Sequence, residues 1–254
     1  MSQPSLLYKT PCYSPVGDCA MLIELGQGID PTINERVLQL ENQIRKLRVS
    51  GVVETTPAYA SLLLHYDPDQ VSFSDLQATV SSIHLDSLPA ERQRFGWQIP
   101  VCYGGEFGAD LDYVAEYHHL TTAEVIRLHS KARYRVYMMG FAPGFTYLGG
   151  LPEQLHTPRR DNPRLHTPAG SVSIGGMQAL IAGVAMPSGW QLLGQTPLAT
   201  YDPQRDPPFL IAPGDEVHFH PVNATEFKRL EKAAAKGKWA AEKVSLSEGA
   251  DSHE

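Results

Sequence analysis

Residues 140–198 carry glycine and proline at so many positions that no long helix can form there. Each proline removes a backbone donor and fixes φ, while each glycine permits positive φ or a close approach of two backbones. Short apolar runs stand between these breaks, at residues 171–174, 179–182 and 190–193. The segment therefore predicts a small antiparallel β-barrel or sandwich with several tight turns.

Three arginines, Arg159, Arg160 and Arg164, interrupt this segment and are flanked by Pro158 and Pro163. Arginines held between rigid prolines suit a fixed anion site, because the guanidinium fork matches a carboxylate or a phosphate. The alternative is that they are solvated or paired with acidic residues of the same loop. The sequence leaves both interpretations open.

Residues 1–88 combine strand-like runs with two amphipathic helical patterns. Strands are expected at 6–8, 20–25, 52–55 and 61–66. Asp30 is expected to cap a helix that continues to Leu47, and Ser72 with Asp75 forms a capping box before the second helix. This combination predicts a compact α+β domain.

A polar connector at 86–96 precedes a second predicted domain, residues 95–224. Asp110 is expected to cap a short helix that reaches His119, and Thr121 with Glu124 opens the next helix. Strands are expected at 97–103, 134–139, 207–211 and 216–220. Residues 225–254 are predicted to form an extension, helical to about Lys243 and then disordered.

The composition excludes several classes of protein. A net charge of −7 without a basic stripe argues against a nucleic-acid partner. No window approaches the roughly 18 consecutive apolar residues of a membrane span, and the N-terminus lacks the pattern of a signal peptide. Three cysteines without a CxxC motif favour a reducing compartment. A cytoplasmic protein is therefore expected.

Common catalytic motifs are missing from the sequence. The glycine-rich stretch 104–110 has neither nucleotide-binding fingerprint, and Ser171 does not stand in a G-x-S-x-G motif. No HExxH or Cys/His ligand set accompanies the ten histidines, so no metal is predicted on this chain alone. His129 ends a helix, where it either complements the helix dipole or faces a cleft as a proton donor or acceptor. Tyr147 and Trp190 either pack the barrel or contact a ligand.

Four motifs together are far more specific than any of these. They are GFAPGFTYLG at 140–149, PRR at 158–160 followed by PR at 163–164, PAGSV at 168–172, and GWQLLG at 189–194. With these motifs the chain resembles the family of the 5-oxoprolinase B subunits, a group that also includes the sporulation kinase A inhibitor protein. The resemblance extends from about Tyr13 to Val222.

The resemblance implies a small α+β N-terminal domain followed by a cyclophilin-like β-barrel domain, without implying prolyl isomerase activity. It implies one component of an ATP-dependent lactam hydrolase that opens 5-oxoproline to L-glutamate. The implied partners are the A subunit and the carboxyltransferase-like C subunit of 5-oxoprolinase, with ATP and Mg in the assembled complex and no activity in this chain alone. The alternatives are an inhibitor of a sensor histidine kinase and, from an older family label, a protein that acts on allophanate.

The same resemblance suggests roles for residues of the central segment. Phosphorylation of the lactam oxygen requires cations near the phosphoryl group and a partner for the substrate carboxylate. Arg159 and Arg164 are the candidates for these roles, with His129 as an acid or base. The candidate substrate-binding residues are Tyr147, Ser171, Gln178 and Trp190.

Overall fold

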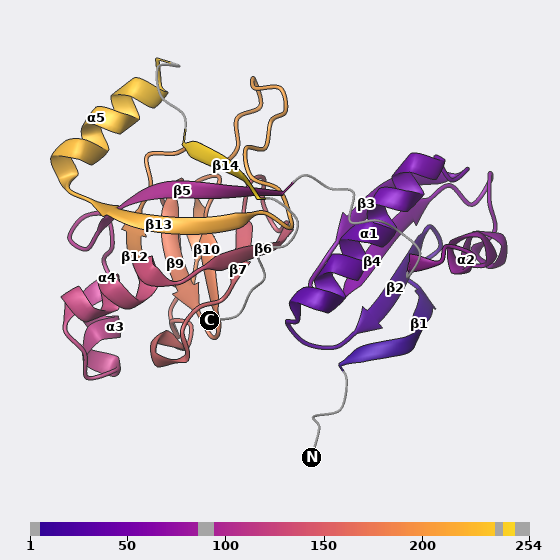
Figure 1. The fold of residues 1–254 in the computed structure, drawn as a ribbon, viewed down its shortest axis with the longest axis horizontal. Helices are drawn as coiled ribbons and strands as arrows, with labels where there is room; N and C mark the ends of the chain where they lie inside the picture. The colour runs from indigo at the N-terminus through magenta and orange to yellow at the C-terminus, as the bar shows by residue number, and fades with distance from the viewer. Residues whose placement is uncertain (1–5, 86–93, 237–240, 247–254) are drawn as a thin grey trace. The chain divides into compact units, whose positions relative to one another are not determined.

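The structure of the chain is a computed structural model that describes residues 6–85, 94–236 and 241–246. The chain divides into two compact units, Met1–Arg92 and Gln93–Glu254, and each is described by itself (Figure 1).

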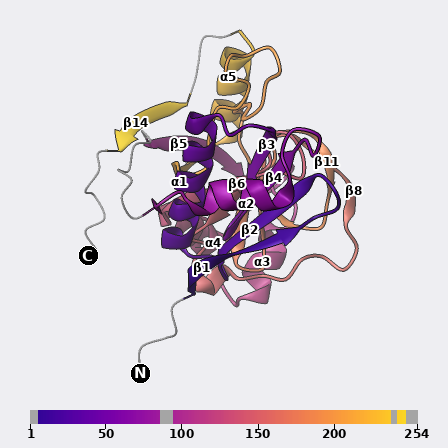
Figure 2. The same ribbon diagram turned by 90° about the vertical axis from the view of Figure 1, so that its right-hand side faces the viewer.

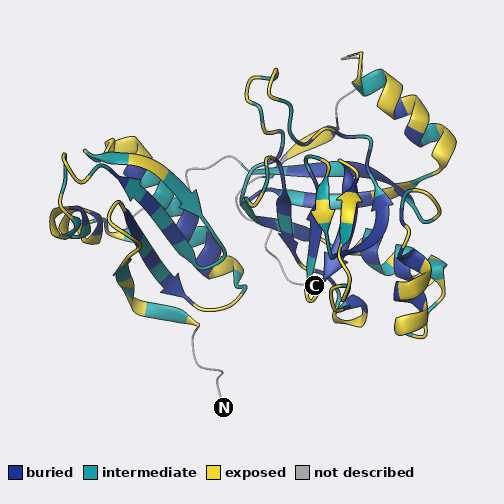
Figure 3. Ribbon diagram, turned by 180° about the vertical axis from the view of Figure 1, so that it is seen from behind, coloured by how far each residue is buried: buried dark blue, intermediate teal, exposed yellow. Residues whose placement is uncertain are grey.

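The first unit is an antiparallel sheet with two helices. The strand order is β1 (Leu7–Pro15), β2 (Ala20–Gly26), β4 (Ser61–Tyr66) and β3 (Val52–Pro57), and the helices are α1 (Pro31–Leu47) and α2 (Phe73–Ser81). Residues such as Ile23 and Leu62 of the sheet pack with Val37 and Ile44 of α1 in one core. Figure 3 shows the resulting buried and exposed faces of these elements.

Both predicted helix starts of this unit are confirmed. Asp30 accepts hydrogen bonds from the backbone N–H groups of Thr32 and Ile33 at 2.8 and 3.0 Å. Ser72 accepts one from the N–H of Asp75 at 3.1 Å. Each cap satisfies backbone donors that have no partner within the helix, so the sequence fixes where each helix begins.

The second unit contains a closed β-barrel. Its main sheet has the order β12 (Gln191–Gln195), β9 (Ser171–Gly175), β10 (Gln178–Ile181), β7 (Thr146–Gly149), β6 (Tyr134–Met139), β13 (Glu216–Val222), β5 (Arg94–Tyr103) and β14 (Glu242–Leu246). Pairing between β12 and β5 closes the ring and leaves β14 outside it. The expected α+β fold with a β-barrel domain is thereby confirmed.

Helices and a small second sheet surround the barrel. The helices are α3 (Leu111–Tyr117), α4 (Thr122–Lys131), the short η2 (Glu153–Leu155) and α5 (Ala224–Ala234). Strands β8 (Arg164–Thr167) and β11 (Met186–Ser188) pair antiparallel, side by side in Figure 2. This pair and the loop before β8 carry all three arginines of the glycine- and proline-rich segment.

Two predictions for the C-terminal part are wrong. The last helix ends at Ala234, not near Lys243, and Glu242–Leu246 pairs with β5 as strand β14. Gly237 is a poor helix former, and the alternation of Val244 and Leu246 suits a strand. The predicted disorder of residues 247–254 lies outside the described residues.

The expected strand at residues 207–211 is also absent, because these residues form only one isolated bridge, Tyr201 with Phe209. Pro207 and Pro208 lack the N–H that a ladder requires. The guanidinium of Arg205 instead donates to carbonyl oxygens of this loop, including those of Pro207 and Pro208 at 3.2 and 2.9 Å. The loop is therefore held by a side chain and not by a strand ladder.

Candidate functional site

The strands β7 and β10 contribute their two faces to different hydrophobic clusters. Ala179 and Ile181 of β10 belong to the barrel core, whereas Leu180 and the following Ala182 belong to a second cluster with Phe145 and Trp190. This division follows from the period of two along a strand. We call the second cluster, with the partly buried Tyr147 packed against it, the aromatic face.

Trp190 is the centre of the aromatic face. Its ring lies 6.1 Å from the ring of Tyr147, centroid to centroid, in an edge-to-face arrangement. Gly175 makes room for it, since a Cβ at that position would stand 2.8 Å from Cδ2 of Trp190. Nothing in the sequence indicates that this glycine accommodates an indole ring, which only the structure shows.

Arg159 lies over the same ring, with Cζ 5.3 Å from the Trp190 centroid. Its side chain belongs to an exposed residue, and no carboxylate among the described residues lies within ion-pair distance of it. Burial raises the pKa of Tyr147, and the charge of Arg159 partly opposes that rise. Arg159 and Tyr147 therefore provide a cation and an uncharged phenol beside the ring of Trp190. This combination suits a small, planar anion.

Arg164 is engaged elsewhere. Its Nη2 donates to Oδ1 of Asp110 at 2.6 Å, and Nη1 of Arg160 donates to the same oxygen at 2.9 Å. The other carboxylate oxygen, Oδ2, accepts from the N–H of Leu192 at 2.7 Å. Asp110 is almost completely buried, so the structure joins Arg164 to an acid and not to Arg159.

The prediction that Asp110 caps a helix is confirmed for its position and wrong for its side chain. It stands at the N-cap position of α3, but its side chain makes no capping hydrogen bond. Two guanidinium groups and one backbone N–H attract the carboxylate more strongly than the helix end does, because hydrogen bonds between ions are the stronger ones. No local sequence signal links Asp110 to arginines 50 residues away.

Gln178 and Ser171 lie on the strands of the aromatic face. Gln178 is the register partner of Gly175 and shares its strand face with Leu180. Ser171 is buried, and its hydroxyl donates to the carbonyl of Pro168 at 2.7 Å, within the turn before β9. Gln178 thus lies beside the tryptophan site, while the Ser171 hydroxyl is occupied by its own turn.

His129 lies in the core of the second unit and is fully buried. Its ring stacks on Phe219 with centroids 4.8 Å apart, and its Nδ1 shares a 2.8 Å hydrogen bond with the hydroxyl of Tyr103. Burial lowers its pKa to about 3. No described contact joins the ring to Arg159 or Arg164, so the structure does not bring the three predicted catalytic residues together.

Three amides of the glycine-rich turn after β5 are hydrogen-bonded within the protein. The amides of Gly104, Phe107 and Gly108 donate to backbone carbonyls of Leu193 and Gly104.

Among the described residues there is no group of three or more His, Cys, Asp or Glu that could hold a metal ion. No helix in the described ranges is long and apolar enough to cross a membrane.

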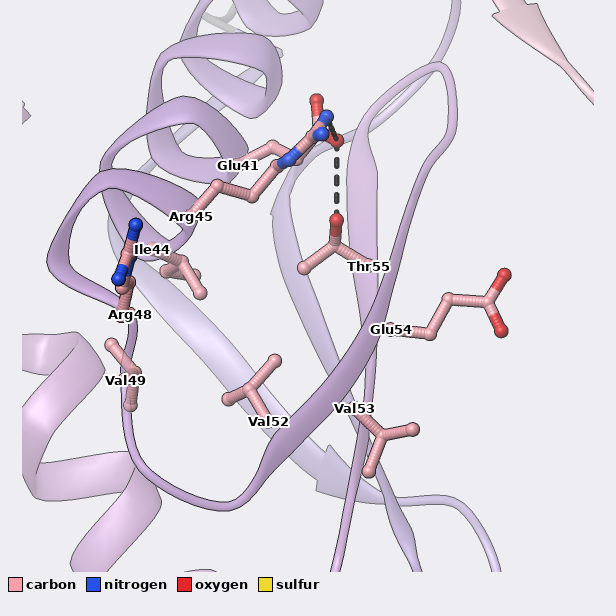
Figure 4. Close-up of a pocket in the computed structure, with 9 residues that line it drawn as sticks. All are labelled: Glu41, Ile44, Arg45, Arg48, Val49, Val52, Val53, Glu54 and Thr55. Atoms are coloured by element: carbon pink, nitrogen blue, oxygen red, sulfur yellow. Dashed lines mark hydrogen bonds and ion pairs between the residues drawn. The ribbon is translucent and has the colours of Figure 1, made fainter. Parts of the chain in front are cut away.

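The first unit has a separate hollow of about 540 Å³ between the end of α1 and β3. Figure 4 shows Val49, Val52 and Val53 along it, with Glu41 hydrogen-bonded to Thr55 at 3.1 Å. Two glutamates, Glu41 and Glu54, and two arginines, Arg45 and Arg48, are among its lining residues, and it lies wholly within the first unit. Its shape and balanced charge identify no particular ligand.

Comparisons with known proteins agree with the four sequence motifs. The carboxyltransferase domain family, subdomains C and D, matches residues 11–211. The 5-oxoprolinase B subunit of Bacillus subtilis is 39% identical over 84% of this chain and 93% of its own length. That of Haemophilus influenzae is 53% identical over 59% of this chain and 70% of its own length.

A solved structure, that of TTHA0988, is 38% identical and superposes with a TM-score of 0.72 over 81% of this chain. The chain spans 40% of the length of that relative, so its fold there is part of a longer polypeptide. These matches cover both units and the whole arginine-bearing segment. The chain belongs to the carboxyltransferase subdomain C and D family, in the group of the 5-oxoprolinase B subunits.

Proposed function

We propose that the chain is the B subunit of an ATP-dependent 5-oxoprolinase that converts 5-oxoproline to L-glutamate together with the A and C subunits of that enzyme. The names of the curated relatives support this activity. The observation on this chain that carries the proposal is the exposed guanidinium of Arg159 over the Trp190 ring, beside Tyr147. The free thiols of Cys12, Cys19 and Cys102 suit the reducing cytoplasm.

5-Oxoproline is a flat five-membered lactam with one carboxylate. Arg159 would bind the carboxylate through its fork of donors, and Trp190 would support the ring of the substrate. The phenol of Tyr147 stays protonated at neutral pH, since burial raises its pKa, and would lie beside the substrate as an uncharged polar wall. In this proposal the chain binds and orients the substrate.

ATP supplies the activation of the lactam oxygen when the complex is assembled. In the turn Gly104–Gly108, the amides of Gly104, Phe107 and Gly108 already donate to backbone carbonyls, so these three are not available to a phosphate. The nucleotide-dependent step is accordingly assigned to the assembled complex and not to this turn. Turnover by the isolated chain is not expected.

The test is ATP-dependent glutamate release from 5-oxoproline by the chain mixed with its A and C partners, with each protein omitted in turn. Full activity only in the complete mixture supports the proposal. Activity that persists when this chain is omitted, or no activity from three folded proteins, contradicts it.

A further inference from the structure

Two hydrogen bonds, one from a side chain and one between backbones, join the residues on both sides of Arg159 to the residues on both sides of Trp190. The carbonyl of Pro158 accepts from Nε2 of Gln191 at 2.9 Å, and the N–H of Arg160 donates to the carbonyl of Gly189 at 2.7 Å. The loop at Arg159 thus crosses the chain at Trp190, just before β12, and Pro158 and Arg160 are each bonded to a neighbour of Trp190. This crossing places Arg159 over the indole ring.

Asp110 connects the other end of this loop to strand β12, which begins directly after Trp190. Its Oδ1 binds the guanidinium groups of Arg160 and Arg164, and its Oδ2 binds the N–H of Leu192, two residues after Trp190. Three donors at 2.6 to 2.9 Å converge on one buried carboxylate. A buried carboxylate requires such partners, and the partners in turn lose their geometry without it.

We propose that Asp110 is the positioning residue that holds Arg159 over Trp190, acting through Arg160, Arg164 and Leu192. This inference rests on the proposed function for the identity of the ligand, a small carboxylate such as 5-oxoproline. Asp110 itself does not touch that ligand. Arg164, in this arrangement, is a structural partner of Asp110 through its Nη2.

The discriminating variant is Asp110→Asn. Asparagine has the same shape but only one acceptor oxygen, and its amide hydrogens would face either the guanidinium groups or the N–H of Leu192. Asparagine must therefore lose the hydrogen bonds to the two arginines or the one to Leu192. Asp112→Asn is the matched control, because Asp112 is an exposed acid in the same helix.

The first readout is independent of catalysis. In the NMR spectrum of the arginine side chains, the Nε–H signal of Arg159, assigned by its loss in Arg159→Lys, is expected at an upfield position caused by the Trp190 ring current. Asp110→Asn should move this signal to the position of a solvated arginine, and Asp112→Asn should leave it in place. An unmoved signal in folded Asp110→Asn overturns the proposal.

The second readout is activity in the mixture with the A and C subunits. Asp110→Asn should raise KM for 5-oxoproline about tenfold, the equivalent of one displaced charged hydrogen bond, and leave kcat within about twofold. If the signal of Arg159 moves while KM is unchanged, Asp110 positions the arginine but the proposed ligand is wrong. If Asp110→Asn fails to fold, Arg164→Gln, which leaves the bond to Leu192 intact, replaces it, and an unmoved Arg159 signal in that variant overturns the proposal.

Discussion

The guanidinium of Arg159 lies 5.3 Å from the centroid of the Trp190 ring, measured from Cζ. A cation over an indole face contributes about 0.5–1 kcal/mol at an exposed site, and more when water is excluded. The backbone that carries this charge is held in place as well, because Pro158 is hydrogen-bonded to Gln191 and Arg160 to Asp110. A ligand carboxylate would meet an arginine that is already placed.

Replacement of Arg159 by Gln should weaken substrate binding selectively. Loss of a charged hydrogen bond costs about 1.5–3 kcal/mol, so KM for 5-oxoproline should rise about 10- to 100-fold with kcat nearly unchanged. The KM of Arg159→Lys should lie between those of the wild type and Arg159→Gln, since lysine keeps the charge but not the forked guanidinium. Arg127→Gln, an exposed arginine of α4, is the control, and steady-state kinetics of the assembled complex measure all three. An equal change of KM in Arg159→Gln and Arg127→Gln would show that Arg159 does not bind the substrate.

Gly175→Ala should displace the indole without changing any charge. The new Cβ would lie 2.8 Å from Cδ2 of Trp190, closer than real Cβ contacts allow. We expect a changed near-UV circular dichroism spectrum and weaker binding of 5-oxoproline by the complex. Gly96→Ala is the matched control, because its Cβ would meet Leu246 at an ordinary 3.4 Å. Unchanged binding in Gly175→Ala would show that the position of Trp190 is not needed.

Local signals in the sequence predict most of the fold. Gly and Pro between short apolar runs indicate the barrel strands, and Asp30 and Ser72 mark the helix starts. The site is harder to predict, because its connections span many residues. Nothing near Asp110 indicates that it will meet Arg164 rather than cap α3. The motif places Arg159 and Trp190 in one segment, but their contact depends on how the barrel closes.

The burial of His129 also depends on a contact between residues far apart in the sequence. Its position near the end of a helix fits either a surface residue or a core residue, and the sequence does not show that Phe219, 90 residues later, stacks on it. Hydrophobic packing between distant elements overrides the local preference for a charged histidine at a helix end. The ring is therefore buried and neutral.

This burial predicts a pH dependence of stability. The pKa of His129 is about 3 in the folded chain, against 6.5 for an ordinary histidine. The unfolded state thus binds more protons between these values, and stability present above pH 6.5 is lost as the pH falls towards 3, by at most about 1.4 kcal/mol per pH unit. Urea unfolding of the wild type between pH 7 and 4 measures the slope, with His166→Gln as the exposed-histidine control.

The paired variant Tyr103→Phe/His129→Leu removes both partners of the buried hydrogen bond. It should flatten the slope below pH 6.5, and at pH 7 it should be more stable than His129→Leu alone, which leaves the Tyr103 hydroxyl without its 2.8 Å partner. An unpaired buried hydroxyl costs about 1–3 kcal/mol. A slope identical to that of the wild type would show that other groups control the acid sensitivity.

Strand β14 offers a test in the C-terminal part of the second unit. The Nζ of Lys243 lies 4.0 Å from the ring centroid of Phe95 and 5.6 Å from that of Trp97, across the β14–β5 pair. Lys243→Gln should lower the free energy of unfolding by about 0.5–1 kcal/mol, the value of an exposed cation–π contact. Trp97, Trp190 and Trp239 all belong to this unit, so tryptophan fluorescence during urea unfolding follows it alone. Lys228→Gln, on the exposed side of α5, is the control and should leave the free energy of unfolding unchanged. Equal unfolding free energies for Lys243→Gln and Lys228→Gln would mean that Lys243 does not hold β14 against the aromatic side chains of β5.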